Sequence, residues 1–386
     1  MRSALMSGCS PLQESLGDEV LAAIAEKLDH DFAEFVGGPA KAGCLIEPLG
    51  LLCQVDETTV RDAAVASITS LVRWNPKREK VVLGPDQLYI SLVPLVFRLL
   101  CVSRDGWFPP RVSGCELIAD AYRASFECQK AFPHLTLPVE ELKKQLDPNS
   151  VGGMLGGGDP VTVRTLPRTS HLPACALRPV LVPFTNGLPA ARHSLVPTRG
   201  TMLASQISQA LVELYKSCCD PAGDAAVRRR AGEKMGDVAT AFGPDITRSE
   251  LVPLWCAMVK EAEQESIRVK TLPAAPKIFE VASLDEPANG SATLPGPLFV
   301  ACASDKSWRV RNAVAQTLPD VVKAVDADVP AANETGVRAP SPQVTLAFQL
   351  FCKLLKEDSE AEVRQTGRRR LRGRRRYSRR IFVARS

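Results

Sequence analysis

The sequence predicts an all-α fold in which short helical repeats stack into a solenoid. Three observations lead there: a recurring turn with a following arginine, an apolar stretch before each turn, and a regular spacing. The clearest copy reads DKSWRVRNAVAQTLPDVV (305–322), and the pattern arginines at 228, 268 and 311 lie 40 and 43 residues apart. HEAT and armadillo units have roughly 40–47 residues. Because such a unit cannot bury its own apolar face, neighbours must stack, which predicts a HEAT-repeat α-solenoid of about seven helix pairs.

Each predicted unit consists of an apolar helix, an acidic turn and a second helix that carries the arginine near its start. The apolar helices include LVPLVFRLL (92–100), LVPLWCAMV (251–259) and FQLFCKLLK (348–356). The further copies of the turn are DETTVR (56–61), DAAVRR (224–229), EQESIR (263–268) and DSEAEVR (358–364).

The composition agrees with packed helices inside a cell. Of the 386 residues 45% are hydrophobic and only 5% aromatic, and the twelve cysteines include no CxxC pair. Such cysteines are typical of small buried hydrophobes and not of a disulfide framework. The start has no long apolar core of a signal peptide, and no apolar run is long enough to cross a bilayer. We expect a soluble, cytoplasmic protein, with the nucleus as a second location.

Composition divides the chain into four parts. Residues 148–200 hold eight prolines and seven glycines with one acidic residue, and residues 368–380 hold nine arginines and no acid. A long stretch without helical periodicity is unusual inside a compact fold, so it predicts a disordered insertion. The predicted parts are HEAT repeats (1–145), the disordered insertion (146–203), a second block of HEAT repeats (204–366) and an Arg-rich tail (367–386).

Three local expectations follow from the same patterns. Residues 17–38 are expected to form one helix that ends at Gly37 and Gly38. Pro273 and Pro276 are expected to interrupt the second helix of their unit, because an interior proline removes a hydrogen bond. The Arg-rich tail is expected to replace the second helix of the last unit. The apolar face of the first helix is predicted to carry Val20, Leu21, Ile24, Leu28, Phe32 and Phe35.

The repeated arginine allows two interpretations. It is either a row of partner-binding cations or a ladder, in which each guanidinium bonds an acidic residue or a helix-end carbonyl of the adjacent repeat. A feature placed once per repeat favours the ladder. The arginines concerned are Arg61, Arg228, Arg268, Arg311 and Arg364.

The turns themselves vary from unit to unit. Trp107 and Trp308 each put a large aromatic ring on such a turn. Because Trp and Arg are over-represented at interface hot spots, a partner-binding role is one interpretation, and local packing of the turn is the other. Trp308 is expected to stay partly exposed unless something covers it. The Arg-rich tail is either a nuclear-import or nucleic-acid-binding segment or an extension without a role of its own.

Catalysis finds no support. The four histidines (residues 30, 134, 171 and 193) are dispersed, and no GxSxG, HExxH or phosphate-loop motif is present. We expect a protein that is not an enzyme and needs no cofactor or metal.

Several motifs resemble the 65-kDa scaffold (A) subunit of protein serine/threonine phosphatase 2A. They occur in that family's order, and the resemblance covers roughly residues 2–142 and 205–364. The motifs include FVGGPA (35–40), VDETTVRDAAV (55–65), GPDITRSELVPL (243–254), ASDKSWRVRNAVA (303–315) and LLKEDSEAEVR (354–364).

The resemblance implies a non-catalytic horseshoe of HEAT repeats whose intra-repeat turns hold other subunits. In that family the N-terminal half grips a regulatory B-type subunit and the C-terminal repeats grip the catalytic subunit. Since the pattern here stops after about seven units, the catalytic subunit is expected to bind only indirectly. Carried over by motif, the partner-binding residues would be Asp18, Glu19, Asp56, Glu57, Trp107, Phe108, Arg228, Arg229, Ser307, Trp308 and Arg309.

One departure weakens the resemblance at the turn before Arg228, because Ala225 and Ala226 stand where the family has Pro-Met before its Val-Arg-Arg. Two other functions stay open. One is a HEAT-repeat adaptor of another class, such as a transport carrier, and the other is a nucleic-acid-associated protein that acts through the Arg-rich tail. No membrane partner is expected.

Overall fold

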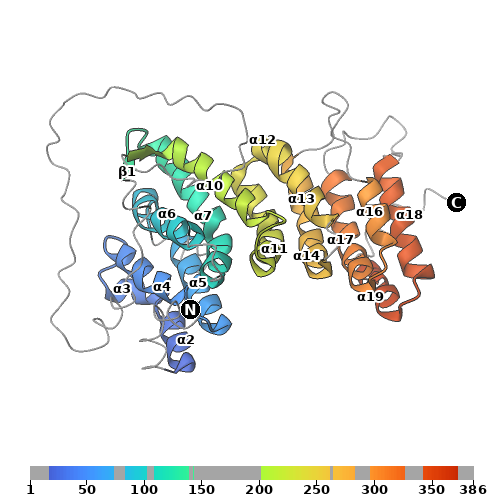
Figure 1. Cartoon of the computed structure of the whole chain (residues 1–386), viewed down its shortest axis with the longest axis horizontal. Coiled ribbons are helices and arrows are strands. Elements are labelled where there is room, and N and C mark those ends of the chain that lie inside the picture. Colours follow the sequence, from blue (N-terminus) through green and yellow to red (C-terminus); the bar gives the residue numbers. More distant parts are fainter. Residues whose placement is uncertain are drawn as a thin grey trace.

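The structure, a computed structural model, describes residues 17–73, 83–101, 108–138, 142, 201–260, 264–282, 296–326 and 342–372. In these residues antiparallel helix pairs follow one another along the long axis of the molecule (Figure 1). The pairs are α4 (Ile46–Leu52) with α5 (Thr58–Val72), α6 (Pro85–Cys101) with α7 (Pro109–Ala131), α10 (Ala204–Cys218) with α11 (Ala225–Phe242), α13 (Val252–Val259) with α14 (Glu265–Thr271) and α15 (Ala275–Ala282), α16 (Gly296–Ala303) with α17 (Trp308–Asp326), and α18 (Pro342–Glu357) with α19 (Ala361–Arg372).

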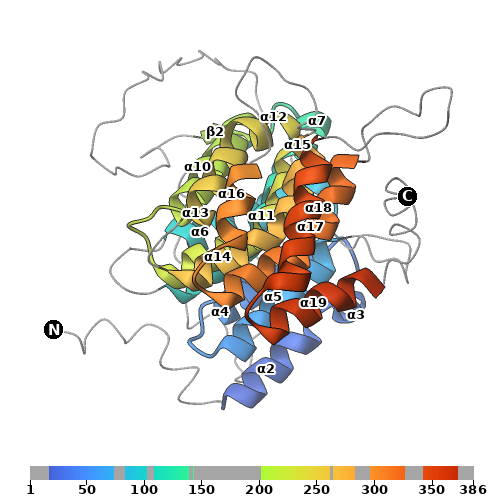
Figure 2. The ribbon, with the colours of Figure 1, turned by 90° about the vertical axis from the view of Figure 1, so that its right-hand side faces the viewer.

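The helices form the continuous stack that the repeats predict. Each second helix packs against the next second helix, in the order α5, α7, α11, α14–α15, α17 and α19. Seen from the α18–α19 end, the pairs lie one behind another (Figure 2). The all-α solenoid is therefore confirmed, with six pairs in the described residues and α2 (Asp18–Lys27) packed on α5 before the first of them. No helix in the described ranges is long and apolar enough to span a membrane.

One apolar core runs through the whole stack. It begins at Leu21 on α2 and extends to Val363 on α19. Trp255 on α13 shows how neighbouring units pack together. The centre of its ring lies 5.5 Å from the ring centre of Phe279 on α15 and 5.8 Å from that of Phe299 in the next unit. Its Nε1 also donates a 2.9 Å hydrogen bond to the Thr271 carbonyl, so the polar atom of this buried ring is satisfied.

The prediction of a single helix over residues 17–38 is wrong. The chain forms α2 and then α3 (His30–Phe35), because Asp29 between them caps α3 by accepting hydrogen bonds from the amides of Asp31 (2.8 Å) and Phe32 (3.2 Å). The break rotates the second half out of register, so Phe35 is 84% exposed although the helical pattern placed it in the core. The expected stop is present, since Gly37 and Gly38 both adopt positive φ.

The two blocks of repeats meet directly. Helix α7 packs on α10 and α11, although α7 and α10 are far apart in sequence. Strands β1 (Thr136–Pro138) and β2 (Thr201–Leu203) pair antiparallel beside this junction, which the all-α prediction missed. Of the predicted insertion over residues 146–203, only β2 lies within the described residues.

Two predicted interruptions are milder than expected. Around Pro273 the chain forms only a 3₁₀ turn (Leu272–Ala274) between α14 and α15, so the second helix continues in two pieces. At the C-terminal end α19 runs to Arg372 and crosses the predicted tail boundary at 366. Arginine is a good helix former, and α19 packs on α17 and α18, so the last unit does have its second helix.

Candidate functional site

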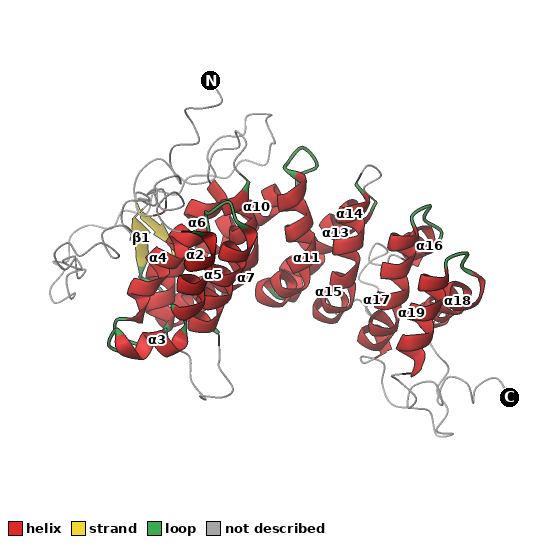
Figure 3. Cartoon of the chain, turned by 90° about the horizontal axis from the view of Figure 1, so that it is seen from below, coloured by secondary structure: helices red, strands yellow, loops and turns green. Residues whose placement is uncertain are grey.

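The turns within the repeats lie along one edge of the solenoid. Figure 3 shows the turns after α10, α16 and α18 on the same side of the molecule. This placement follows from the stack itself, because equivalent turns of successive units must lie side by side. It gives the chain a ridge of turns, which we call the turn ridge, comprising residues 53–57, 219–224, 304–307 and 358–360.

An arginine braces several of the described turns from within; Arg61 and Arg228 are buried, and Arg364 is half-buried. Arg61 donates a 2.8 Å hydrogen bond to the Val55 carbonyl and another to the Asp56 carbonyl. Arg364 bonds the Asp358 and Ser359 carbonyls in the same way, and Arg228 bonds the Pro221 carbonyl at 3.4 Å. Each guanidinium therefore satisfies carbonyls near a helix end that have no intrahelical partner.

Two arginines also reach the next repeat, which confirms the ladder there. Arg311 makes a bidentate contact with Asp358 of the following turn, at 2.7 Å and 3.0 Å, and bonds the Asp305 carbonyl of its own turn at 2.8 Å. Arg268 pairs with Asp305 of the following turn at 3.3 Å. The Asp358 side chain is only 3% exposed, so this ion pair is well shielded from water. These contacts fix neighbouring turns relative to each other.

The pKa of Asp358 reflects its environment. Burial would raise the pKa of the carboxyl, but the hydrogen bonds from Arg311 and from the Glu360 amide, with the charge of Arg311, outweigh burial and hold its pKa below the ordinary value of 3.8. The same hydrogen bond raises the pKa of Arg311. Both shifts favour the charged pair.

Arg309 and Trp308 are set differently from the ladder arginines. The Arg309 side chain is 62% exposed and pairs with Glu265 of the preceding unit at 3.4 Å. Its guanidinium carbon lies 5.3 Å from the centre of the Trp308 ring, within cation–π range. Trp308 is half-buried and packs against the core, so its own unit covers part of the ring and the rest stays exposed.

Most of the other predicted partner-binding residues are on or beside the turn ridge. Asp56, Arg229 and Glu19 are exposed, Asp18 is half-buried in the first turn of α2, and Phe108 is 38% exposed at the start of α7. Glu57 and Ser307 act as caps, since Glu57 accepts from the Thr59 amide and Ser307 from the Arg309 amide, both at 3.3 Å. Trp107 lies outside the described residues.

Arg228 was predicted to contact a partner, but the structure places its side chain in the interior. Its side chain is buried, with 3% exposed, and points into its own turn. Arg228 therefore braces its own turn, and its neighbour Arg229 presents the exposed charge.

The ladder interpretation expected acidic partners in the adjacent repeat but did not identify which residues they are. Asp305 and Asp358 each bind an arginine of the preceding unit, and Glu265 pairs with Arg309. Each of these acids stands in a copy of the turn pattern, so the sequence did mark them as candidates. Their pairing could not be read from one copy, because each partner belongs to a different unit.

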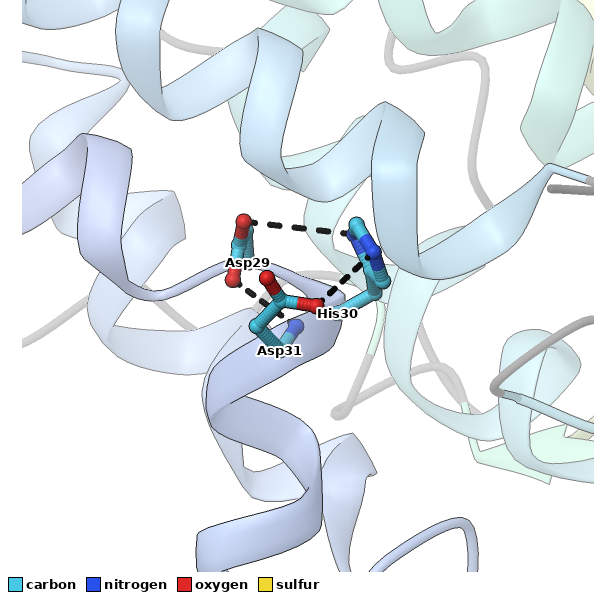
Figure 4. A group of neighbouring side chains, drawn as sticks. All are labelled: Asp29, His30 and Asp31. Carbon is cyan, nitrogen blue, oxygen red and sulfur yellow. Dashed lines mark hydrogen bonds and ion pairs between the residues drawn. The ribbon is translucent and has the colours of Figure 1, made fainter. Parts of the chain in front are cut away.

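Asp29, His30 and Asp31 form the one group of possible metal-ligand side chains found in the described part of the chain (Figure 4). His30 Nε2 lies 3.0 Å from an Asp31 oxygen, and Nδ1 lies 3.9 Å from an Asp29 oxygen. Because Asp29 already caps α3 and the three residues are consecutive, the group is explained by helix capping.

A family model described as "HEAT repeat" matches residues 296–325. These residues comprise α16 and nearly all of α17, the unit that carries Trp308, Arg309 and Arg311. The repeat type predicted from spacing is therefore confirmed at this unit.

The chain is similar to several phosphatase subunits. It is 40% identical over 114 residues to the beta isoform of the 65 kDa regulatory (A) subunit of serine/threonine-protein phosphatase 2A from Rattus norvegicus. It is 37% identical over 132 residues to the regulatory (A) subunit of protein phosphatase PP2A from Schizosaccharomyces pombe. It is 36% identical over 115 residues to the protein phosphatase 2A scaffold subunit of Dictyostelium discoideum.

These matches cover 30%, 32% and 30% of this chain and only 17%, 20% and 18% of the relatives, so the chain spans about a fifth of their length. They confirm the resemblance to the phosphatase 2A scaffold subunit. The relatives are named as regulatory or scaffold subunits, which agrees with the expectation of a non-catalytic protein.

The contrast between Arg311 and Arg309 gives a first test. Replacing Arg311 by Ala leaves the shielded Asp358 carboxylate without its ion-pair partner and with only the Glu360 amide as a hydrogen-bond donor, so we expect a loss of about 3 kcal/mol in the free energy of unfolding. Arg309→Ala removes an exposed pair and is expected to cost less than about 1 kcal/mol. Urea unfolding of both variants measures this, and equal losses would contradict the ladder.

The Asp358 pair also predicts a pH dependence. Because the folded pKa of Asp358 lies below its unfolded value, its contribution to stability is present above about pH 4 and is lost as the pH falls through the folded pKa. The melting temperature of the wild type should therefore fall more steeply below pH 4 than that of Asp358→Asn. Parallel curves for the two proteins would show that Asp358 does not contribute.

Proposed function

We propose that this chain is a scaffold subunit of a protein phosphatase 2A-type complex and that its turn ridge holds a regulatory B-type subunit. The observation that carries the proposal is the similarity to relatives named as regulatory (A) or scaffold subunits, combined with a HEAT unit whose turn residues face outward. A solenoid with its turns aligned is suited to this task, since it offers an extended surface without requiring a pocket.

The ridge combines a rigid base with variable contacts. The buried arginines fix the turns, so a partner meets a surface that loses little conformational freedom on binding. Toward the solvent the ridge presents Asp56, Asp224 and Glu360, and Arg229 and Arg309 are exposed directly after two of its turns. A partner that follows the ridge would therefore meet acidic turns with an arginine beside two of them, and such patterning favours one register.

Arg309 is the residue that we propose as the anchor. The half-buried Trp308 ring supports its guanidinium through a cation–π contact, and Glu265 holds it through an ion pair. Such support restricts the side chain before binding, which lowers the entropy cost of a bidentate contact with a carboxylate of the partner.

We propose that contact with the catalytic subunit is indirect. The motif positions carried over from the resemblance are those implied for a regulatory subunit, and Phe108, Arg229 and Arg309 belong to that set. The complex would then form through the B-type subunit in cells, and we propose the cytoplasm as its main location.

We expect purified B-type subunit to bind the full chain, and Arg309→Ala to weaken that binding about tenfold, the loss of one charge-assisted contact of about 1.4 kcal/mol. The melting temperature should stay close to that of the wild type. Calorimetric titration measures affinity, and Arg368→Ala is the matched control because Arg368 is also exposed but lies on α19 away from the turns.

Three outcomes would count against the proposal. Absence of binding would remove the scaffold function, and equal effects of the two variants would remove Arg309 from the interface. Binding of isolated catalytic subunit without any B-type subunit would overturn the indirect arrangement. Trp308→Ala is a poorer probe, since loss of its core packing should lower the melting temperature as well.

A second candidate function is favoured by α19. Arg368, Arg369 and Arg370 are all exposed on this last described helix, and further arginines follow in sequence. We propose nucleic-acid binding as the alternative. Affinity for single-stranded RNA that falls steeply with salt and is lost on charge neutralisation of these three residues would support it, because phosphate contacts release counterions.

A further inference from the structure

Helix α7 is enclosed at the place where the two blocks of repeats meet. It lies between α5 and α11 (Figure 3), and from Pro109 to Ser125 every residue is buried except Glu116 and Arg123. These two residues are seven positions apart, so they lie on one face of the helix, and the buried Asp120 between them shares that face. The neighbouring helices place charged side chains against this polar face of α7.

One bridge of ion pairs, which we call the Arg230 bridge, crosses this face from α11 to α5. Arg230 on α11 pairs with Glu116 on α7 through Nε at 3.3 Å and with Asp62 on α5 through Nη2 at 3.5 Å. Lys234, one turn further along α11, pairs with Glu116 at 3.1 Å. Arg230 therefore contacts both the helix next to its own and the helix beyond that one.

A second bridge, the Asp120 bridge, crosses the same face of α7 further along the helix. Arg73, the residue after α5, donates two hydrogen bonds of 2.9 Å to the buried Asp120 carboxylate. Arg123 donates to the same carboxylate at 2.8 Å and to the Asp237 carbonyl of α11 at 3.5 Å. The two bridges thus connect α5 to α11 at two levels of α7.

Such connections are unusual in a solenoid, because a repeat normally contacts only its direct neighbours. A side chain of α11 can reach Asp62 only if α5 and α11 close over α7, which requires the stack to bend toward this face. A single exposed ion pair contributes little to stability, but charges that form a network contribute more. The Glu116 side chain is only 11% exposed and binds two cations, so the centre of the Arg230 bridge is partly shielded from water.

We propose that Arg230 holds α5 and α11 closed over α7 and thereby fixes the bend of the solenoid at the junction of the two blocks. A guanidinium is suited to this role, because its donors point in several directions and can bond carboxylates on two other helices at once. With the Arg230 bridge closed, the turns of the first and second block keep a fixed position relative to each other. This inference concerns the junction and does not depend on the proposed partner.

Zero-length cross-linking of the full chain tests whether the bridge forms. A carbodiimide joins a lysine amine to a carboxylate only where the two groups touch. Arg230→Lys makes position 230 reactive, and Asp62→Glu is added because glutamate is longer than aspartate and restores the reach that lysine loses. We expect position 230 joined to tryptic peptide 62–73, and Lys234 joined to peptide 112–123 as the control pair between neighbouring helices. A control cross-link without the link between positions 230 and 62 contradicts the proposal, and so does the absence of both.

Hydrogen exchange of α7 tests what the bridge does. In Arg230→Ala we expect the amides of residues 112–125 to exchange about tenfold faster, which corresponds to about 1.4 kcal/mol in their opening equilibrium. Lys270→Ala is the matched control, because Lys270 pairs with Glu233 between α11 and α14, and its α7 should exchange as in the wild type. Equal exchange in all three proteins, or equal acceleration in both variants, overturns the proposal. Since the cross-link is read from a variant that keeps both charges, that result stands even if Arg230→Ala folds poorly.

Discussion

The buried or half-buried guanidinium near the start of α5, α11, α14, α17 and α19 is the interaction on which the rest of the structure depends. A buried charge must have partners for its donors, and the ladder arginines find them in the carbonyls of their own turn and the acids of the next. Arg311 uses both, since it binds the Asp305 carbonyl and the Asp358 carboxylate. The same side chain thus closes one repeat and sets the position of the following one.

This bracing separates structural residues from those available for partners. Arg228 and Arg229 are neighbours in sequence, but the first is buried in its turn and the second is exposed. Arg309 and Arg311 repeat the arrangement two residues apart. A helix alternates its faces on this short scale, so one Val-Arg-Arg or Arg-Val-Arg segment can support the stack and present a charge to a partner. Trp308 stands between the two roles because it packs on the core and supports Arg309.

Repeat spacing was enough to predict the solenoid, because the period and the apolar stretches are local properties of the chain. What failed depended on details that periodicity does not contain. Asp29 offers a cap that breaks the expected first helix, and the arginines that follow residue 367 continue α19 to Arg372 because arginine is a good helix former. In the candidate site the turn residues were predictable from the motif, but the pairs Arg268–Asp305 and Arg309–Glu265 were not, since each joins two different units.

The central claim is that the aligned turns, and not the outer faces of the helices, are the binding surface. Hydrogen exchange of the backbone amides with and without purified B-type subunit tests it most directly. The account predicts that slowed exchange concentrates at the turns around residues 56–59, 222–227 and 305–309, with little change in the middle of α6 and α10. Protection of those helices with unchanged exchange at the turns would contradict it.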